Sequence, residues 1–147
     1  MTGIECVSVI KDIVIVAVAI YTSWWARKTF AYKDKVSELK ELLVALEAIK
    51  LEAFIYLQLT PINGDKKNDL GDLFKMMFDF QKKINSALHI DDDTRNKASD
   101  MSVFLKEKLF FNISTKDKKT IDAMRSDFDK LHSRLGTAIR KQLKRYR

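Results

Sequence analysis

The feature that most constrains this chain is an apolar run near its N-terminus. Residues 13–26 carry no charge and are apolar at almost every position. A helix that is apolar on every side belongs in a protein core or in a membrane. Trp24 and Trp25 lie near the end of the run, and Arg27 and Lys28 follow it. Tryptophans beside basic residues are typical of a membrane helix where it meets the headgroups on the cytoplasmic side.

This run is shorter than a membrane span, so its neighbours must complete one. Crossing ~30 Å of hydrocarbon takes about 20 helical residues, whereas the charge-free run has 14. The long side chains of Arg27 and Lys28 can reach the interface from one end. At the other end, Lys11 and Asp12 would lie near the outer interface, where a charge costs less than at mid-bilayer. We therefore expect a transmembrane helix over about residues 10–30.

The basic residues after the run predict its orientation. Lys33 and Lys35 extend the positive charge, and segments rich in Lys and Arg stay in the cytoplasm. We expect residues 1–32 to anchor a single-pass protein in a membrane with the N-terminus outside. Residues 33–147 should then form a cytoplasmic domain that includes the C-terminus.

Three other interpretations compete with the anchor. A cleaved signal peptide needs a basic beginning, but the first charge is Glu5. An amphipathic helix lying in the membrane plane needs a polar face, which residues 13–26 lack. A buried core helix of a soluble protein stays open, because 14 apolar residues are an ordinary length for such a helix.

Small and polar residues recur along one side of the expected anchor. Asp12, Ala19 and Ser23 are separated by seven and four positions, so they share a helix face. Small and hydroxylated residues on one face favour contact between helices in lipid. These residues are therefore candidates for self-association of the anchor. The alternative is that Lys11 and Asp12 only mark the outer end of the helix.

Beyond the anchor, apolar residues recur every three or four positions, which predicts amphipathic helices. The predicted segments are a helix that ends near Leu59, helices over 68–88 and 94–111, and a last helix capped by Ser114 or Thr115. Pro61 and the following Asn63-Gly64-Asp65 predict a turn, and Asp91 to Thr94 predict a link and N-cap. With no strand-like alternation, we predict an all-α fold in which the anchor precedes an antiparallel four-helix bundle.

Two of these helices have well-defined apolar faces. The expected face of the 68–88 helix consists of Leu70, Leu73, Phe74, Met77, Ile84 and Leu88, widened by Phe78 and Phe80. The last helix carries a heptad seam made of Ile121, Met124, Phe128, Leu131, Leu135 and Ala138. Such a seam is either the buried stripe of a bundle helix or the interface of an oligomeric coiled coil, and its short length favours the bundle.

Groups with catalytic or metal-binding chemistry are few. Cys6 is the only cysteine, which excludes an internal disulfide and a cysteine-rich metal site. His89 and His132 could bind a metal only if the fold brought them together. The acidic stretch at Asp91 lacks the further oxygen ligands and the glycine of a calcium loop. No nucleophile triad or glycine-rich phosphate loop is present, so we expect no enzyme, no cofactor, no metal and no small-molecule substrate.

Most of the net charge of +7 lies in residues 121–147. No acidic residue follows Asp129, and the last positions contain Arg140, Lys141, Lys144, Arg145 and Arg147. These cations could be a solvated helix end, could contact anionic lipid at the cytoplasmic leaflet or could bind nucleic acid. Lipid contact and solvation rank equally, and nucleic acid ranks third because no recognition motif accompanies the charge.

Three short stretches carry a resemblance. They are Ile10-Lys11-Asp12-Ile13, then Trp24-Trp25-Ala26-Arg27-Lys28, and Leu73-Phe74 in the body. With them, the chain resembles a loose group of small bacterial inner-membrane proteins that have an N-terminal anchor and a helical cytoplasmic domain. The resemblance covers mainly the first 35 residues and implies no activity.

Three functions are compatible with these patterns. The first is a membrane-anchored, non-enzymatic binding or regulatory protein, which binds a protein partner or a second copy at the cytoplasmic face. The second is a small toxin or defence protein whose anchors assemble along Asp12, Ala19 and Ser23 and disturb the bilayer. The third is a soluble basic helical protein that binds nucleic acid.

Overall fold

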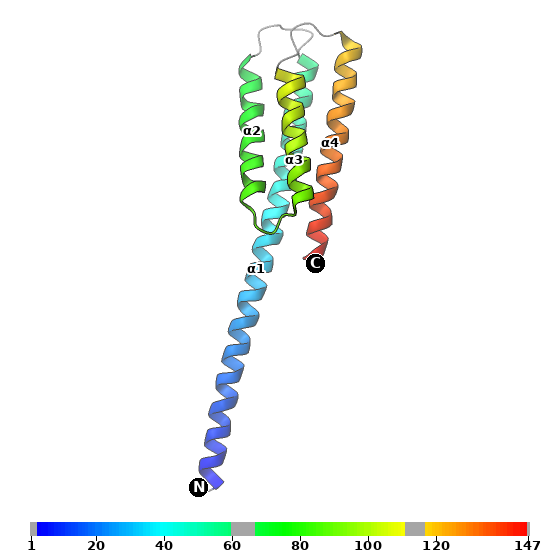
Figure 1. Ribbon diagram of the computed structural model, residues 1–147. Helices are drawn as coiled ribbons and strands as arrows, with labels where there is room; N and C mark the ends of the chain where they lie inside the picture. The colour runs from blue at the N-terminus through cyan, green and yellow to red at the C-terminus, as the bar shows by residue number, and fades with distance from the viewer. Residues whose placement is uncertain (1–2, 60–66, 111–116, 147) are drawn as a thin grey trace. The chain divides into compact units, whose positions relative to one another are not determined.

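The computed structural model describes residues 3–59, 67–110 and 117–146 (Figure 1). For residues 3–12, 59, 67–69 and 110 only the backbone is described. Every regular element in these ranges is helical. The elements are α1 (Gly3–Leu59), α2 (Lys67–Ser86), α3 (Asp92–Phe104), a short π-helix η1 (Leu105–Phe110) and α4 (Lys118–Arg145). The all-α prediction is confirmed for these residues, whereas the turn predicted after Leu59 lies outside them.

The chain divides into two compact units. Unit 1 is Met1–Ser37, and unit 2 is Glu38–Arg147. Unit 1 contains the N-terminal part of α1, and unit 2 contains the rest of α1 with α2, α3, η1 and α4.

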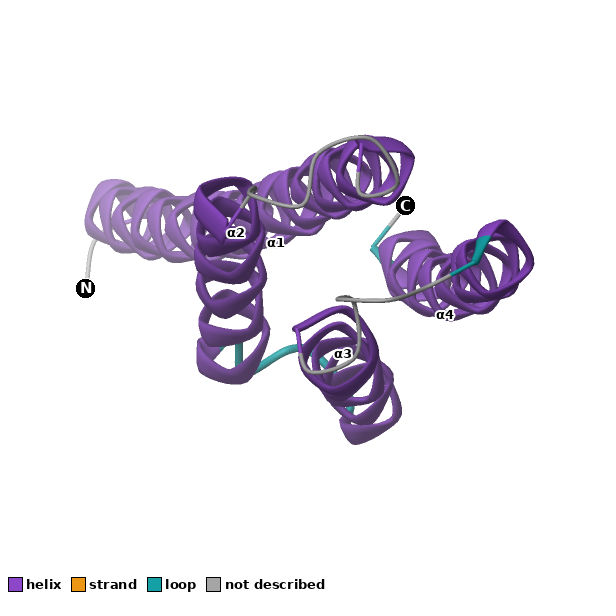
Figure 2. Ribbon diagram, turned by 90° about the horizontal axis from the view of Figure 1, so that it is seen from above, coloured by secondary structure: helices purple, strands orange, loops and turns teal. Residues whose placement is uncertain are grey.

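Within unit 2 the four helices form a bundle (Figure 2), and the colour gradient of Figure 1 shows that successive helices run in opposite directions. Lys50 of α1 pairs with Asp129 of α4, and the preceding Glu47 lies beside His132. The residue numbers fall along α1 where they rise along α4, so the two helices run in opposite directions. Helix α3 packs against both α2 and α4, and α2 borders α1 across a shallow groove. The order around the bundle is therefore α1, α2, α3, α4.

The core of the bundle is built from unit 2 alone. All buried apolar side chains of the described residues lie between Leu39 and Leu143. Phe128 of α4 is fully buried, and its ring centroid is 6.2 Å from that of Phe54 and 6.3 Å from that of Phe104. A buried aromatic or leucine side chain contributes about 1.5–3 kcal/mol relative to its exposed state. Most of the apolar residues predicted for the faces of α2 and α4 belong to this core.

The predicted apolar faces need two corrections. Leu88 is 97% exposed, because α2 ends at Ser86 and Leu88 lies in the link between α2 and α3. Phe78 is 69% exposed, because it lies 100° around the helix from the buried Met77. The seam of α4 is buried in the bundle except for the half-buried Leu131, which agrees with bundle packing.

Two helices begin with the same capping arrangement. Asp91 precedes α3, and its carboxylate accepts a hydrogen bond from the Thr94 N–H at 2.9 Å. Asp117 precedes α4 and accepts from the Thr120 N–H at 2.9 Å. A side-chain oxygen at this position satisfies one of the free N–H groups of the first turn. The cap predicted at Asp91 is confirmed, whereas the cap predicted at Ser114 or Thr115 is wrong, because Asp117 takes that role.

Two helical glycines provide a test of the bundle packing. A Cβ at Gly71 would meet nothing within 4 Å, and one at Gly136 would lie 3.3 Å from Arg140 Nη1 and 3.6 Å from Leu46 Cδ2. Because the Arg140 side chain can move, both Gly71→Ala and Gly136→Ala should stabilise the protein by about 0.5–1 kcal/mol in urea unfolding. If Gly136→Ala destabilised while Gly71→Ala stabilised, the contact of α4 with α1 would be tighter than described.

Candidate functional site

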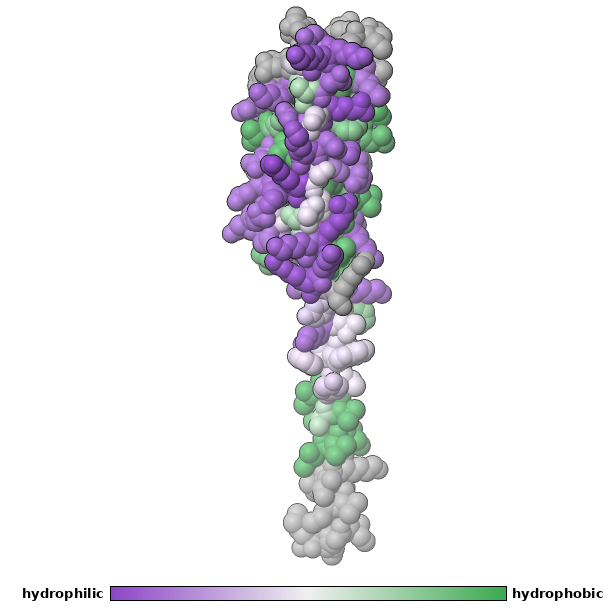
Figure 3. Space-filling model, turned by 90° about the vertical axis from the view of Figure 1, so that its right-hand side faces the viewer, coloured by the Kyte–Doolittle hydropathy of each residue, from purple (hydrophilic) through white to green (hydrophobic). Residues whose placement is uncertain are grey.

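Unit 1 exposes an unusual number of large apolar side chains. Their exposed fractions lie between 41% and 66%, and they belong to Ile13, Val14, Ile15, Val16, Val18, Ile20, Tyr21, Trp24, Trp25, Phe30 and Tyr32. Four of them are consecutive, so they point to every side of the helix. Figure 3 shows a green, hydrophobic band on α1, followed by a pale segment. Among the described residues, no helix holds a stretch that is long and apolar enough to span a bilayer.

The aromatic and basic residues at the end of the run interact with one another. Lys28 Nζ lies 5.0 Å from the centroid of the Trp24 ring, a cation–π distance. The Tyr21 ring centroid is 6.2 Å from that of Trp24. Trp25, Arg27 and Lys28 are exposed. The Trp24 ring and the Lys28 ammonium, two of the residues predicted for the membrane interface, are therefore in contact on one side of α1.

Two hydroxyl groups of unit 1 bond to the backbone of their own helix. Thr22 Oγ1 donates to the Val18 carbonyl at 2.9 Å and also lies 3.1 Å from the Ala19 carbonyl. Thr29 Oγ1 donates to the Trp25 carbonyl at 2.9 Å. These donors need no partner from outside the helix, as an apolar surrounding requires.

The residues predicted for anchor self-association are only partly described. Ala19 and Ser23 are exposed. The side chains of Lys11 and Asp12 lie outside the described residues. The structure therefore tests neither the interface role of Lys11 and Asp12 nor the stripe as a whole.

The C-terminal end of α4 lies at the same end of unit 2 as Glu38. His89 Nε2 is 3.6 Å from Glu38 Oε2, and the His89 ring centroid is 6.1 Å from the Tyr146 ring. Arg145 Nη1 lies 3.7 Å from Asp91 Oδ2 in the α2–α3 link. The start of unit 2, the α2–α3 link and the C-terminal end of α4 therefore lie together at one end of the bundle.

The predicted lipid-contact residues differ in their surroundings. Arg140 Nη2 lies 3.8 Å from Glu47 Oε1, and Arg145 faces Asp91, so both are partly neutralised. Lys141 and Lys144 are exposed, and neither has a carboxylate within ion-pair distance in the described part of the chain. Arg147 lies outside that part.

Lys141 also lines a shallow groove between α3 and α4. The groove has a volume of about 420 Å³. Lys97 and Arg134 line it as well, and so does Asp93, which pairs with Lys97. Figure 3 shows that the outer face of unit 2 on this side is mostly hydrophilic.

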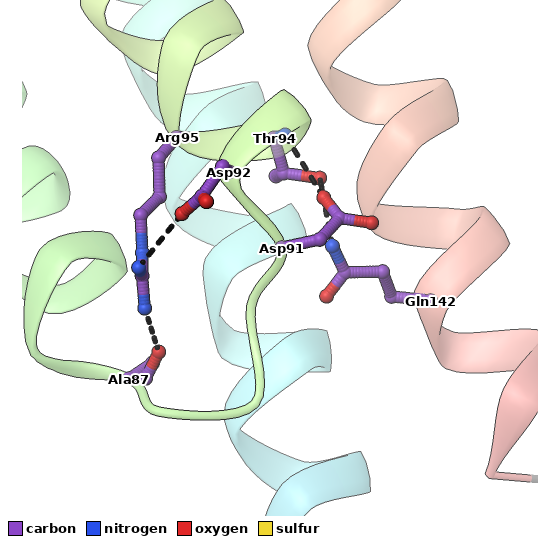
Figure 4. Close-up of polar contacts among 6 residues, drawn as sticks. All are labelled: Ala87, Asp91, Asp92, Thr94, Arg95 and Gln142. Carbon is purple, nitrogen blue, oxygen red and sulfur yellow. Dashed lines mark hydrogen bonds and ion pairs between the residues drawn. The ribbon is translucent and has the colours of Figure 1, made fainter.

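A buried polar network joins α3 to α4 near the C-terminal end of α4 (Figure 4). Thr94 Oγ1 donates to Asp91 Oδ1 at 2.7 Å and accepts from Gln142 Nε2 at 2.8 Å. Thr94 and Gln142 are both 1% exposed. The Thr94 hydrogen bonds hold the pKa of the Asp91 carboxyl below its usual value of 3.8. The periodicity of α4 gives no sign of Gln142, because it is a polar residue on a buried face.

Arg95 ties the α2–α3 link to the start of α3. Its Nη2 donates to the Ala87 carbonyl at 2.9 Å, and its Nη1 donates to Asp92 Oδ1 at 3.1 Å. The acidic stretch after Ile90 therefore caps a helix and pairs with cations. This arrangement uses the carboxylates that a calcium loop would need as ligands.

His132 is a second buried polar group. It is 5% exposed, and its Nε2 lies 3.6 Å from Glu47 Oε1. Burial lowers the pKa of His132 below its usual value of 6.5, and the nearby Glu47 and Asp129 carboxylates oppose this effect. His89 and His132 contact different glutamates, Glu38 and Glu47. In the described residues no group of three or more His, Cys, Asp or Glu side chains could hold a metal ion.

Comparisons with protein-family models, curated proteins and solved structures find no match for this chain.

The buried network predicts a difference between two threonines. Thr94→Val should lower the free energy of unfolding by about 1–3 kcal/mol, because it leaves the buried Gln142 amide without an acceptor. Thr120→Val at the exposed cap should cost less than about 0.5 kcal/mol. Adding Gln142→Leu to Thr94→Val should restore part of the loss in urea unfolding. Equal losses at Thr94 and Thr120 would contradict the network.

The buried imidazole of His132 predicts a dependence of stability on pH. A folded-state pKa below 6.5 means that the unfolded state binds the proton more readily, so this stability is present above about pH 6.5 and is lost as the pH falls. One such group changes the free energy of unfolding by at most about 1.4 kcal/mol per pH unit. In urea unfolding between about pH 8 and about pH 5, His132→Gln should flatten the dependence.

A second variant should change the pH dependence of stability in the opposite direction. Glu47→Gln removes a carboxylate that favours the charged imidazole, so it should make the loss of stability below about pH 6.5 steeper. Unchanged slopes in both variants would contradict a buried, neutral His132.

Proposed function

We propose that this protein is a membrane-anchored, non-enzymatic binding protein that acts at the cytoplasmic face of a bacterial inner membrane. The observation that carries the proposal is the exposure of large apolar side chains on every side of α1 in unit 1. Soluble proteins rarely leave such a surface uncovered. Lipid covers a helix on all sides at once, whereas a partner helix covers only one face.

The ends of the run fit a bilayer with a short hydrophobic segment. The charge-free residues 13–26 number 14, and a full span takes about 20. Upstream in the sequence, Val9 and Ile10 add apolar length beyond Lys11 and Asp12. Downstream, the Trp24 ring and the Lys28 ammonium form the aromatic and basic pair that suits the headgroup layer. The backbone-bonded hydroxyl of Thr22 removes a polar group from the apolar surface.

The charge of unit 2 supports the same orientation. Lys144 and Arg145 lie at the end of the bundle that contains Glu38, the residue that follows unit 1 in the chain. Each Lys or Arg near an anionic leaflet is worth about 1 kcal/mol. We assign this role mainly to Lys141 and Lys144, because Arg140 and Arg145 have carboxylates beside them.

Membrane extraction tests the proposal. The full chain should stay in the membrane pellet after alkaline carbonate extraction, and the double variant Val16→Arg/Val18→Arg should move to the supernatant. Each arginine near mid-bilayer costs about 2.5–3.5 kcal/mol. Val103→Arg introduces one arginine at an exposed position of unit 2 and should leave the wild-type result unchanged. Wild-type protein that remains in the supernatant without detergent would overturn the proposal.

Two further measurements distinguish the proposal from a reversed orientation and from a membrane-active effector. A reporter fused after Arg147 should be active in the cytoplasm, and activity only in the periplasm would reverse the orientation. Expression should leave the membrane potential unchanged. Depolarisation by the wild type but not by Asp12→Leu would replace the binding proposal with a membrane-active effector.

A further inference from the structure

Helix α1 carries an exposed apolar stripe within unit 2, formed by Val44, Ala48, Leu51 and Ile55, which we call the α1 seam. The residues are separated by four, three and four positions, the spacing of a helix that packs along another helix. Val44 is 71% exposed, Leu51 is 62% exposed and Ile55 is 39% exposed. The stripe therefore has the pattern of an interface without a partner in the described residues.

The other faces of α1 are already occupied by the bundle. Ala45 and Ile49 border α2, Lys50 and Phe54 border α4, and Leu46 is fully buried in the core. On a helix these three groups leave the seam on the fourth side, which faces away from the bundle. Neither bundle stability nor core packing explains why this side is apolar.

Three acids and one base, Lys40, lie beside the seam. Glu41 continues the heptad spacing at its N-terminal end, and Glu47 and Glu52 flank it on opposite sides. Lys50 is paired with Asp129 at 2.6 Å, so it does not offset these acids. Arg140 lies 3.8 Å from Glu47 and offsets part of its charge, so the acidic character beside the seam comes mainly from Glu41 and Glu52. Charged residues that flank an apolar seam select the partner and its orientation. A complementary helix would carry Lys or Arg beside its apolar stripe.

A second copy of this chain fits the seam poorly. In parallel register, Glu47 of one copy would face Glu52 of the other, and the Glu41 residues would face each other. Like charges in these positions are destabilising. An antiparallel copy avoids those contacts and is distinguished from a different protein by cross-linking. The choice of a different protein as the partner rests on the proposed function.

We propose that the α1 seam is the docking site for an amphipathic helix of another protein, whose apolar residues recur every three or four positions and are flanked by Lys or Arg. The contact would be of the helix-on-helix kind, with Leu51 near its centre and the small Ala48 allowing close approach. Such a site would give the anchored bundle its binding activity at the membrane surface.

Synthetic peptides test the charge preference. The full chain in nanodiscs of zwitterionic phosphatidylcholine is titrated with a labelled three-heptad peptide that has Leu at the apolar positions and Lys beside them. The matched peptide carries Glu in place of Lys, and empty nanodiscs give the background. The Lys peptide should bind at least about tenfold more tightly than the Glu peptide. Equal binding of the two peptides, or binding of neither, would overturn the proposal.

Substitutions locate the site. Leu51→Lys should weaken binding of the Lys peptide at least about tenfold, whereas Phe78→Lys, at an exposed position of α2, should leave it unchanged. If Leu51→Lys had no effect, the peptide would be binding elsewhere and the seam would be excluded. Circular dichroism of both variants, matched to the wild type, ensures that a loss reflects the seam and not unfolding.

Disulfide cross-linking tests the competing occupant. In a Cys6→Ser background, Leu51→Cys alone should form no dimer under oxidation in membranes, and neither should a mixture of Ala48→Cys and Leu51→Cys chains. A dimer in the first case would indicate a parallel second copy, and a dimer only in the mixture an antiparallel one. Either result would overturn the proposal. If the chain is found outside the membrane, the peptide titration can be made in buffer, so the anchor and the seam can fail separately.

Discussion

The bundle depends on the packing of Phe128 among three helices. Its ring meets Phe54 of α1 and Phe104 of α3, and its neighbour one turn later on α4 is the buried His132. Removing a fully buried phenylalanine side chain from a core typically costs about 3–5 kcal/mol, a large share of the stability of a domain. The same packing of α4 against α1 and α3 brings Glu47 beside His132 and Thr94 beside Gln142.

Unit 1 has the opposite property, because its apolar side chains contact no core. The buried side chains of the described residues belong to unit 2, and the exposed ones of α1 continue from Ile13 to Phe30. The hydrophobic effect that closes the bundle should therefore also act on unit 1, but through a surface supplied from outside the chain. A bilayer is the surface that we propose. The α1 seam is a smaller exposed apolar surface on the same helix, and the acidic residues beside it favour a basic helix as its partner.

Helix positions were predictable from the sequence because the spacing of apolar residues agrees with the positions of the helix-breaking and capping residues. The apolar spacing and Pro61 predict the end of α1, and Asp91 predicts the start of α3. Side-chain environments were less predictable, because they depend on contacts between distant residues. Thr94 and Gln142 are 48 positions apart, and no local pattern joins them. The apolar spacing places Leu88 on the apolar face of α2, but α2 ends at Ser86 and Leu88 lies beyond it.

The candidate site stays a prediction from the sequence. The order of Trp24 and Lys28 predicts a membrane interface, and the structure adds that the two side chains are in contact. The basic end was identified as one group, yet Arg140 and Arg145 face acids of other segments, which distinguishes them from Lys141 and Lys144. The exposed apolar side of α1 at Leu51 is hard to recognise in the sequence, because its residues alternate with those of the core face.

Tryptophan fluorescence tests the central claim most directly, because both tryptophans of the chain, Trp24 and Trp25, lie in unit 1. The emission of the full chain can be measured in bilayers that contain lipids brominated along the acyl chains, with acrylamide as the aqueous quencher. The account predicts strong quenching by the bromolipids nearest the headgroups and weak quenching by acrylamide. Strong acrylamide quenching with no effect of the bromolipids would contradict it.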